Sequence, residues 1–159
     1  MIALIKLLGA LLVLSVGGFS AFGTVRYEKK RILVLDGWID LILYIRSQID
    51  CYLTPLGEIL LGTDPDLMRA CMSGNGETDL AAMLRSSSIY LDGSTKRLLE
   101  SFVRKIGGGY REEQIKHCDY YVSALRAAKE RMSGELPTRI RLYSTVSICT
   151  AIGTAILLW

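Results

Sequence analysis

Two apolar segments without a single charged residue lie at the two ends of this chain. The first covers residues 7–25 and the second covers residues 142–159. An α-helix rises about 1.5 Å per residue, so each segment in helical form is about as long as the ~30 Å hydrocarbon core of a bilayer is thick. The sequence therefore predicts transmembrane helices over residues 1–25 and 142–159, and a separate domain over residues 26–141.

Basic residues lie on the inner flank of both apolar segments. Four of them, within Arg26–Arg31, follow the first segment directly, and Arg139 and Arg141 precede the second. Lys and Arg are in excess on the cytoplasmic flanks of membrane helices. Both segments therefore predict the same topology for an integral membrane protein, with residues 26–141 in the cytoplasm and both termini on the opposite side.

A cleaved signal peptide is the alternative interpretation of the first segment. Lys6 would supply its basic start, and the small residues in Gly18–Gly23 would supply a cleavage site. Such cleavage would export the basic cluster at 26–31, against the usual charge bias. We therefore favour an uncleaved membrane helix, and an exported helical binding protein is the alternative function.

The charges of the predicted domain are numerous but nearly balanced. Residues 26–141 hold 18 basic and 16 acidic residues, a net charge of +2. The two signs are interleaved along the chain, whereas nucleic-acid-binding domains carry a basic stripe or patch. We therefore expect no nucleic-acid partner.

The four cysteines share no spacing that is typical of a metal site. They are Cys51, Cys71, Cys118 and Cys149, and none belongs to a CxxC or CxxH pattern. We therefore expect buried, reduced thiols. No metal site and no cofactor site is predicted.

The apolar residues of the domain recur at helical spacing, and no strand-like alternation persists. From residue 26 to 53 this spacing predicts a long helix that continues the first apolar segment. A final helix from Tyr110 runs towards the second apolar segment. The residues predicted to face inward on these two helices are Ile32, Leu35, Trp38, Ile39, Ile42, Ile45, Ile49, Leu53, Ile115, Cys118, Val122, Leu125 and Met132.

Capping and turn signals divide the stretch between the long helices. Thr54-Pro55 and Asp64-Pro65 each predict an N-cap followed by proline at the first helical position. Two further helices are predicted to begin at Thr78 or Asp79 and at Ser94. The expected fold class is therefore all-α, a cytoplasmic bundle of about six helices flanked by an N-terminal and a C-terminal transmembrane helix. The inward residues predicted here are Leu67, Met68, Cys71, Met72, Leu80, Met83, Leu84, Leu98, Leu99, Phe102, Val103 and Ile106.

No motif predicts a catalytic residue. Gly107–Gly109 lacks the Lys-Ser/Thr of a phosphate loop and follows no strand, so a helix C-cap and a tight turn are the better interpretation. The only histidine, His117, lies off the apolar face and is predicted to make a surface or interhelical contact. Glu112–Glu113 and Lys129–Arg131 are predicted to be solvated helix faces with i,i+4 pairing. We therefore expect a protein without enzymatic activity.

Two local patterns between the apolar segments resemble those of a known family. One is Thr54-Pro55-Leu56 followed by Glu58, and the other is Ile106-Gly107 followed by Gln114, Lys116 and His117. With this order and layout, the chain resembles the stage III sporulation protein AB family of endospore-forming bacteria.

The resemblance implies a non-enzymatic subunit of the complex that links mother cell and forespore during sporulation. It implies a domain similar to the cytoplasmic helical domain of the platform proteins in type II secretion and type IV pilus machines. Such a platform lies between a cytoplasmic secretion ATPase and a membrane ring. The implied partners are other stage III sporulation subunits, including that ATPase, and membrane lipid, and the resemblance leaves room for assembly of several copies. The implied location of the domain is the mother cell cytoplasm.

Overall fold

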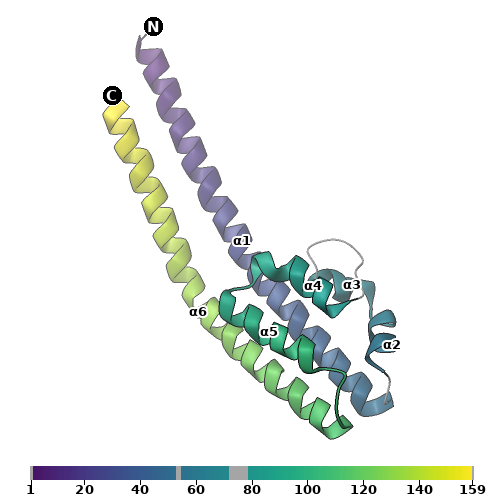
Figure 1. The fold of residues 1–159 in the computed structure, drawn as a ribbon. Helices are drawn as coiled ribbons and strands as arrows, with labels where there is room; N and C mark the ends of the chain where they lie inside the picture. Colours follow the sequence, from purple (N-terminus) through teal and green to yellow (C-terminus); the bar gives the residue numbers. More distant parts are fainter. Residues whose placement is uncertain (1, 53–54, 72–78, 159) are drawn as a thin grey trace. The chain divides into compact units, whose positions relative to one another are not determined.

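The computed structural model describes residues 2–52, 55–71 and 79–158, and its side-chain description leaves out 2–22, 24, 52, 139, 144, 147, 151 and 155–158. Within these ranges every regular element is helical (Figure 1). The predicted all-α class with about six helices is confirmed for the residues that the structure describes. The elements are α1 (Ile2–Tyr52), α2 (Leu56–Leu61), α3 (Pro65–Cys71), α4 (Leu80–Ser87), the 3-10 turn η1 (Ser88–Tyr90), α5 (Gly93–Lys105) and α6 (Arg111–Leu158).

The chain divides into two compact units. One combines residues 1–29 and 133–159, and the other is Lys30–Met132, which we name the helical domain. In the helical domain, ion pairs join α1 directly to α6, and α4 packs on α5. Both α1 and α6 continue beyond this domain as uninterrupted helices, and α6 does so through Pro137.

Across the described residues, no helix is both long enough and apolar enough to cross a bilayer. The first apolar segment, 7–25, lies almost wholly among residues whose side chains are not described. The second, 142–159, also includes undescribed side chains. Both transmembrane helices therefore stay predictions.

The core of the helical domain forms where the predicted apolar faces of α1 and α6 meet the short helices. Trp38 of α1 and Phe102 of α5 are the largest fully buried side chains. The Trp38 Nε1 donates a hydrogen bond to Ser87 Oγ at 3.1 Å, which satisfies the polar end of the indole inside the core. The buried apolar residues predicted correctly on α1 and α6 are Leu35, Trp38, Ile39, Ile42, Ile45, Ile49, Cys118, Val122 and Leu125.

The helices α3 and α4 begin at predicted capping residues, whereas α2 begins one residue later than predicted, because the extended Pro55 is its N-cap and not its first helical residue. Asp64 and Asp79 accept hydrogen bonds from the backbone N–H groups two residues later, at 2.9 Å and 3.3 Å, as expected of N-caps. The prediction that α5 begins at Ser94 was wrong, because Asp92 is its N-cap. Ser94 lies inside the first turn, where its hydroxyl donates a hydrogen bond to the Asp92 carboxylate. Adjacent Asp, Gly and Ser all favour helix starts, so spacing alone does not separate them. Thr54, Met72 and the turn at 73–76 lie outside the described residues.

Candidate functional site

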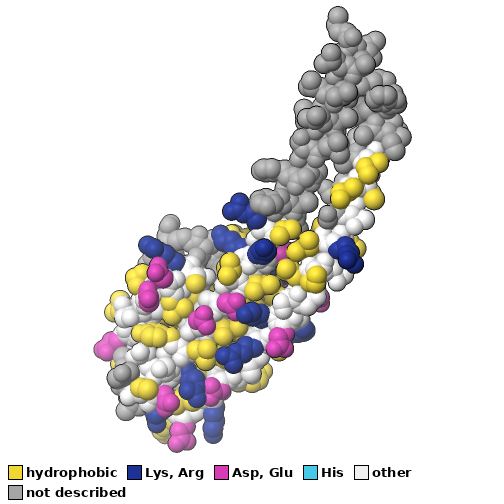
Figure 2. Space-filling model, turned by 180° about the vertical axis from the view of Figure 1, so that it is seen from behind, with side chains coloured by type: hydrophobic (Ala, Val, Ile, Leu, Met, Phe, Trp, Pro, Cys, Tyr) yellow, Lys and Arg dark blue, Asp and Glu magenta, His cyan; other side chains and the backbone are white. Residues whose placement is uncertain are grey.

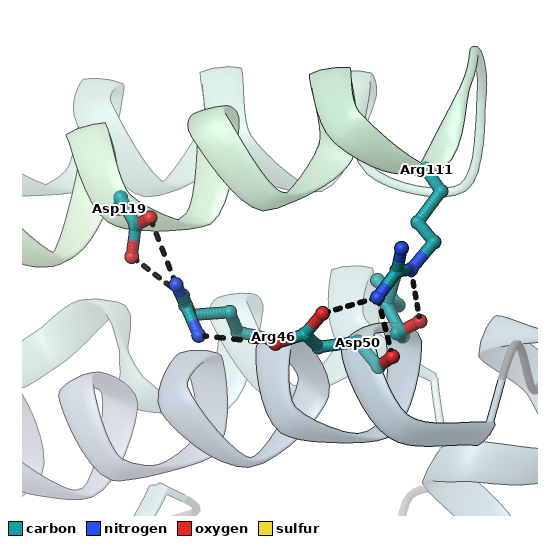
Figure 3. A network of polar contacts seen from close by, with 5 residues as sticks. Arg46, Asp50, Arg111 and Asp119 are labelled. Carbon is teal, nitrogen blue, oxygen red and sulfur yellow. Dashed lines mark hydrogen bonds and ion pairs between the residues drawn. The ribbon is translucent and has the colours of Figure 1, made fainter.

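Charged side chains connect α1 and α6 along one edge of the helical domain (Figure 3). Arg46 holds both carboxylate oxygens of Asp119, with Nε 2.6 Å from Oδ1 and the second nitrogen 3.2 Å from Oδ2. Such a bidentate pair restricts geometry more tightly than a single contact does. The hydrogen bond and the negative charge of Asp119 raise the pKa of Arg46, so this guanidinium stays charged at every physiological pH.

Arg111 makes a second set of contacts between the same two helices. It donates to the backbone carbonyl of Asp50 at 2.6 Å and to that of Ile49 at 3.4 Å, and it also pairs with the Asp50 carboxylate. Arg46 lies 3.9 Å from that same carboxylate, so the two arginines share Asp50 (Figure 3). The start of α6 is therefore fastened to the last turn of α1.

Lys129 and Asp36 form a third connection, with Nζ 2.6 Å from Oδ1. The prediction of i,i+4 pairing was wrong for Lys129, because its ion-pair partner is Asp36 of α1 and not a residue of its own helix. Sequence spacing cannot reveal this partner, since it comes from the packing of two helices. The pairs are partly exposed, so each adds about 1 kcal/mol or less to stability. Together they link α1 to α6 at three points along the two helices.

Gly107 and Gly109 form the turn between α5 and α6. Their φ values are +89° and +92°, in the left-handed region that side chains disfavour. The Ile106 N–H ends α5 by donating to Phe102 O at 2.9 Å. The predicted C-cap and tight turn are confirmed, and the amide of Gln114 steadies the turn by donating to Gly109 O at 3.3 Å.

His117 is half-buried on α6. It forms no hydrogen bond or ion pair with any residue that the structure describes, and the neighbouring Lys116 is exposed. The structure thus places Gln114, Lys116 and His117 beside the turn without bringing them into a common polar cluster. A proton-transfer group needs a partner within hydrogen-bond reach, and the described residues place no such partner beside His117.

Tyr121 is a core residue that was not among the residues predicted to face inward. It is 4% exposed, its hydroxyl lies 2.9 Å from Ser101 Oγ, and its ring packs edge-to-face on Phe102. Its position three residues after Cys118 is a helical spacing that could have revealed it. Tyr121 therefore joins α6 to α5 through both apolar and polar contacts.

The four cysteines are free and fall into two classes. Cys71 and Cys118 are buried, whereas Cys51 and Cys149 are exposed, so the expectation of buried thiols holds for only two of them. Burial, with a smaller effect of Asp40, raises the pKa of Cys71 to about 12. Burial also raises the pKa of Cys118, to about 11. Among the described residues, no group of three or more His, Cys, Asp and Glu side chains could hold a metal ion.

A groove of about 320 Å³ lies between α4 and α5, and we name it the α4–α5 groove. Apolar side chains from both helices form its floor, and charged side chains, most of them basic, form its rim. On the face seen in Figure 2, by contrast, Lys and Arg side chains alternate with Asp and Glu over the helical domain. The residues that line the groove are Ala81, Leu84, Arg85, Lys96, Glu100, Val103 and Arg104.

Comparison with known proteins identifies the family. The family model of stage III sporulation protein AB matches residues 75–159, which is more than half of the chain. The match includes α4, α5 and α6, and with them the α4–α5 groove and the pattern from Ile106 to His117. Searches of curated proteins and of solved structures gave no match. Because the matched residues make up more than half of the chain, the chain belongs to the stage III sporulation protein AB family.

Proposed function

We propose that this chain is a non-enzymatic membrane adaptor of the sporulation complex between mother cell and forespore. In this proposal it couples a cytoplasmic secretion-type ATPase to a membrane ring. Membership of the stage III sporulation protein AB family implies a role in sporulation, and this is not a known enzyme family. Both facts support an assembly role over a catalytic one.

The observation that carries the proposal is the connected pair of long helices. The helical domain joins α1 to α6 through Arg46–Asp119, Arg111–Asp50 and Lys129–Asp36. Two helices that pack on one another move together, because close-packed protein interiors deform little. A load applied to the helical domain would therefore pass into both helices together.

The proposed topology makes the ends of these helices the membrane anchors. It places residues 26–141 in the mother cell cytoplasm and both termini on the other side. The charge asymmetry supports it, since basic residues flank the inner end of each charge-free segment. Membrane lipid and other stage III sporulation subunits would then be the partners.

Deletion of the gene in the native host tests the proposed role. We expect a loss of heat-resistant spores and of late gene expression in the forespore, both restored by the intact gene. As a control, the variant Arg69→Glu should restore spore formation as well as the intact gene does, because its exposed pair with Asp66 lies away from the α1–α6 contacts. Normal spore counts after deletion would contradict the proposal.

Intact mass separates the adaptor from an exported binding protein. Cleavage of a signal peptide of ordinary length would lower the mass of the native protein by about 2 kDa. We expect a mass that includes the first apolar segment, residues 7–25. A cleaved product with the basic cluster near its new N-terminus would favour the exported protein instead.

A further inference from the structure

The helical domain carries an excess of positive charge on one pair of neighbouring helices, α4 and α5. Residues 30–132 hold 14 basic and 14 acidic residues, so the domain as a whole is neutral. Residues 80–105, which contain α4 and α5, hold five basic residues and two acidic ones, a net charge of +3. The rest of the domain is correspondingly acidic. A local excess of this kind attracts partners of opposite charge to one surface.

The α4–α5 groove combines that charge with an apolar floor. Leu84 is 5% exposed, and Ala81 and Val103 are half-buried beside it. Arg85 and Arg104 are exposed on the rim. Long basic side chains can cover apolar surface with their stems while their charged ends stay in water. The groove thus offers apolar contact at its centre and positive charge at its edges.

The basic residues of the rim do not hold the fold together. Arg46, Arg111 and Lys129 each pair with a carboxylate of another helix. Arg85, Lys96 and Arg104, by contrast, form no ion pair with any residue in the described part of the chain. Their charges are therefore available to a molecule outside the domain.

We propose that the α4–α5 groove binds an acidic amphipathic helix of a partner protein. Apolar residues of that helix, spaced i, i+3 and i+4, would lie on Leu84 and Val103, as in other helix-in-groove complexes. Flanking Asp and Glu residues would pair with the rim cations, where hydrogen bonds between charged groups add specificity.

Glu100 and the apolar floor favour a protein helix over nucleic acid. Glu100 lies in the groove between the basic residues, where it repels a continuous run of phosphates. It can instead accept from a basic residue at one end of the bound helix and so set its direction. The inference rests on the proposed adaptor function only in assuming that a protein partner exists.

Peptide binding to the full chain in lipid nanodiscs tests the groove directly. One synthetic helical peptide carries Leu at i, i+3, i+4 and i+7 with Glu on both flanks, and a second has the same composition in scrambled order. By fluorescence anisotropy we expect the first to bind at least about tenfold more tightly than the second, because only it presents an apolar face.

Charge reversal in the groove gives the matched pair of variants. We expect Arg104→Glu to weaken peptide binding at least about tenfold and Arg126→Glu, an equal charge change at an exposed site on α6, to weaken it less than about twofold. Lys96→Glu replaces Arg104→Glu if circular dichroism shows that the latter is unfolded. Equal effects of the groove and control variants, or equal binding of both peptides, would overturn the proposal.

A photocrosslinker at Val103 in sporulating cells identifies the natural occupant, with the exposed Ser123 of α6 as the control position. We expect Val103 alone to capture an acidic amphipathic segment that, as a synthetic peptide, displaces the first probe. Capture of lipid, of a second copy of this chain, or of nothing would overturn the proposal. Gene deletion reports on the adaptor function separately, so a failed groove and a failed adaptor function give different results.

Discussion

Among the described glycines, Gly37 is the one at which an added side chain would have least room. A Cβ atom built there would lie 2.7 Å from the backbone carbon of Ala70 and 2.9 Å from its carbonyl oxygen. Both are backbone atoms of α3, so relief requires a shift of the whole helix rather than of one side chain. The missing side chain therefore allows α3 to pack directly on α1.

Replacement of Gly37 by Ala should destabilise the protein by about 1–3 kcal/mol, the usual cost of overpacking. Chemical unfolding of the full chain in detergent measures the effect. Gly57→Ala is the control, because a Cβ at Gly57 of α2 meets nothing within 4 Å. Equal stability of the two variants would show that α3 does not approach α1 so closely.

The thiols should differ sharply in reactivity. At pH 8 the raised pKa values of Cys71, about 12, and Cys118, about 11, keep both protonated, and burial also blocks access. The exposed Cys51 should therefore react with iodoacetamide, while Cys71 and Cys118 stay unmodified until the protein unfolds. Peptide mass mapping after timed labelling checks this, and early labelling of either buried thiol would refute it.

Contacts between helices that are far apart in the chain hold the helical domain together. Arg46 and Asp119 lie 73 positions apart in the chain, yet their pairing joins α1 to α6. The turn at Gly107–Gly109 brings α6 back along α5, where Tyr121 packs on Phe102. The domain therefore depends on contacts between helices that are distant in sequence.

Reversal of one charge should weaken the contact between α1 and α6. The variant Arg46→Glu places a negative charge beside Asp119 and Asp50. It should lower the free energy of unfolding by about 1 kcal/mol in low salt. The double variant Arg46→Glu with Asp119→Arg should recover most of it, because the pair is restored in reverse. Arg69→Glu, whose pair with Asp66 is over 80% exposed, should change stability little. Additive effects in the double variant would argue against a coupled pair.

Replacement of Gly107 by Ala should destabilise the turn between α5 and α6 by about 1–2 kcal/mol, because Ala at a φ of +89° is strained. Gly108→Ala is the control, since a Cβ at Gly108 meets nothing within 4 Å and its φ is not in the left-handed region. Thermal unfolding of both variants compares them. A loss of stability in Gly108→Ala as large as that in Gly107→Ala would contradict the turn geometry.

At the scale of the whole molecule, two long helices share one domain and continue beyond it. The helical domain ends at Met132, whereas α6 continues to Leu158, and α1 begins at Ile2, well before the domain does. In the proposed adaptor, the same two helices would belong to the domain and to the membrane anchors. Their joint attachment would let one domain act on two anchors.

Reporter fusions test the topology of this arrangement. A reporter that is active only in the cytoplasm, inserted at residues 73–76, should be active, because basic residues flank both charge-free segments on the side of the domain. The same reporter at Met1 should be inactive. The opposite pattern would invert the proposed topology.

Much of the fold was predictable because its signals are local. The 3–4 spacing identified the buried face of α1, Asp64 was recognised as a cap from its neighbours, and Asp79 was one of two candidate caps. Tyr121 was missed because tyrosine has both an apolar ring and a polar hydroxyl, so its residue type alone does not show whether it is buried. The start of α5 was misplaced because Asp92 and Ser94 compete as caps.

Periodicity and backbone preference act over a few residues, so the helical class, the faces that become buried and the turn at Gly107–Gly109 could all be predicted from the amino-acid sequence. The folded structure was needed to show which charges pair within the domain. It pairs Arg46 with Asp119 and Lys129 with Asp36, while Arg104 stays on the rim of the α4–α5 groove. The physical reason is that such pairing depends on how distant helices dock, and docking is set by the shape of the whole core.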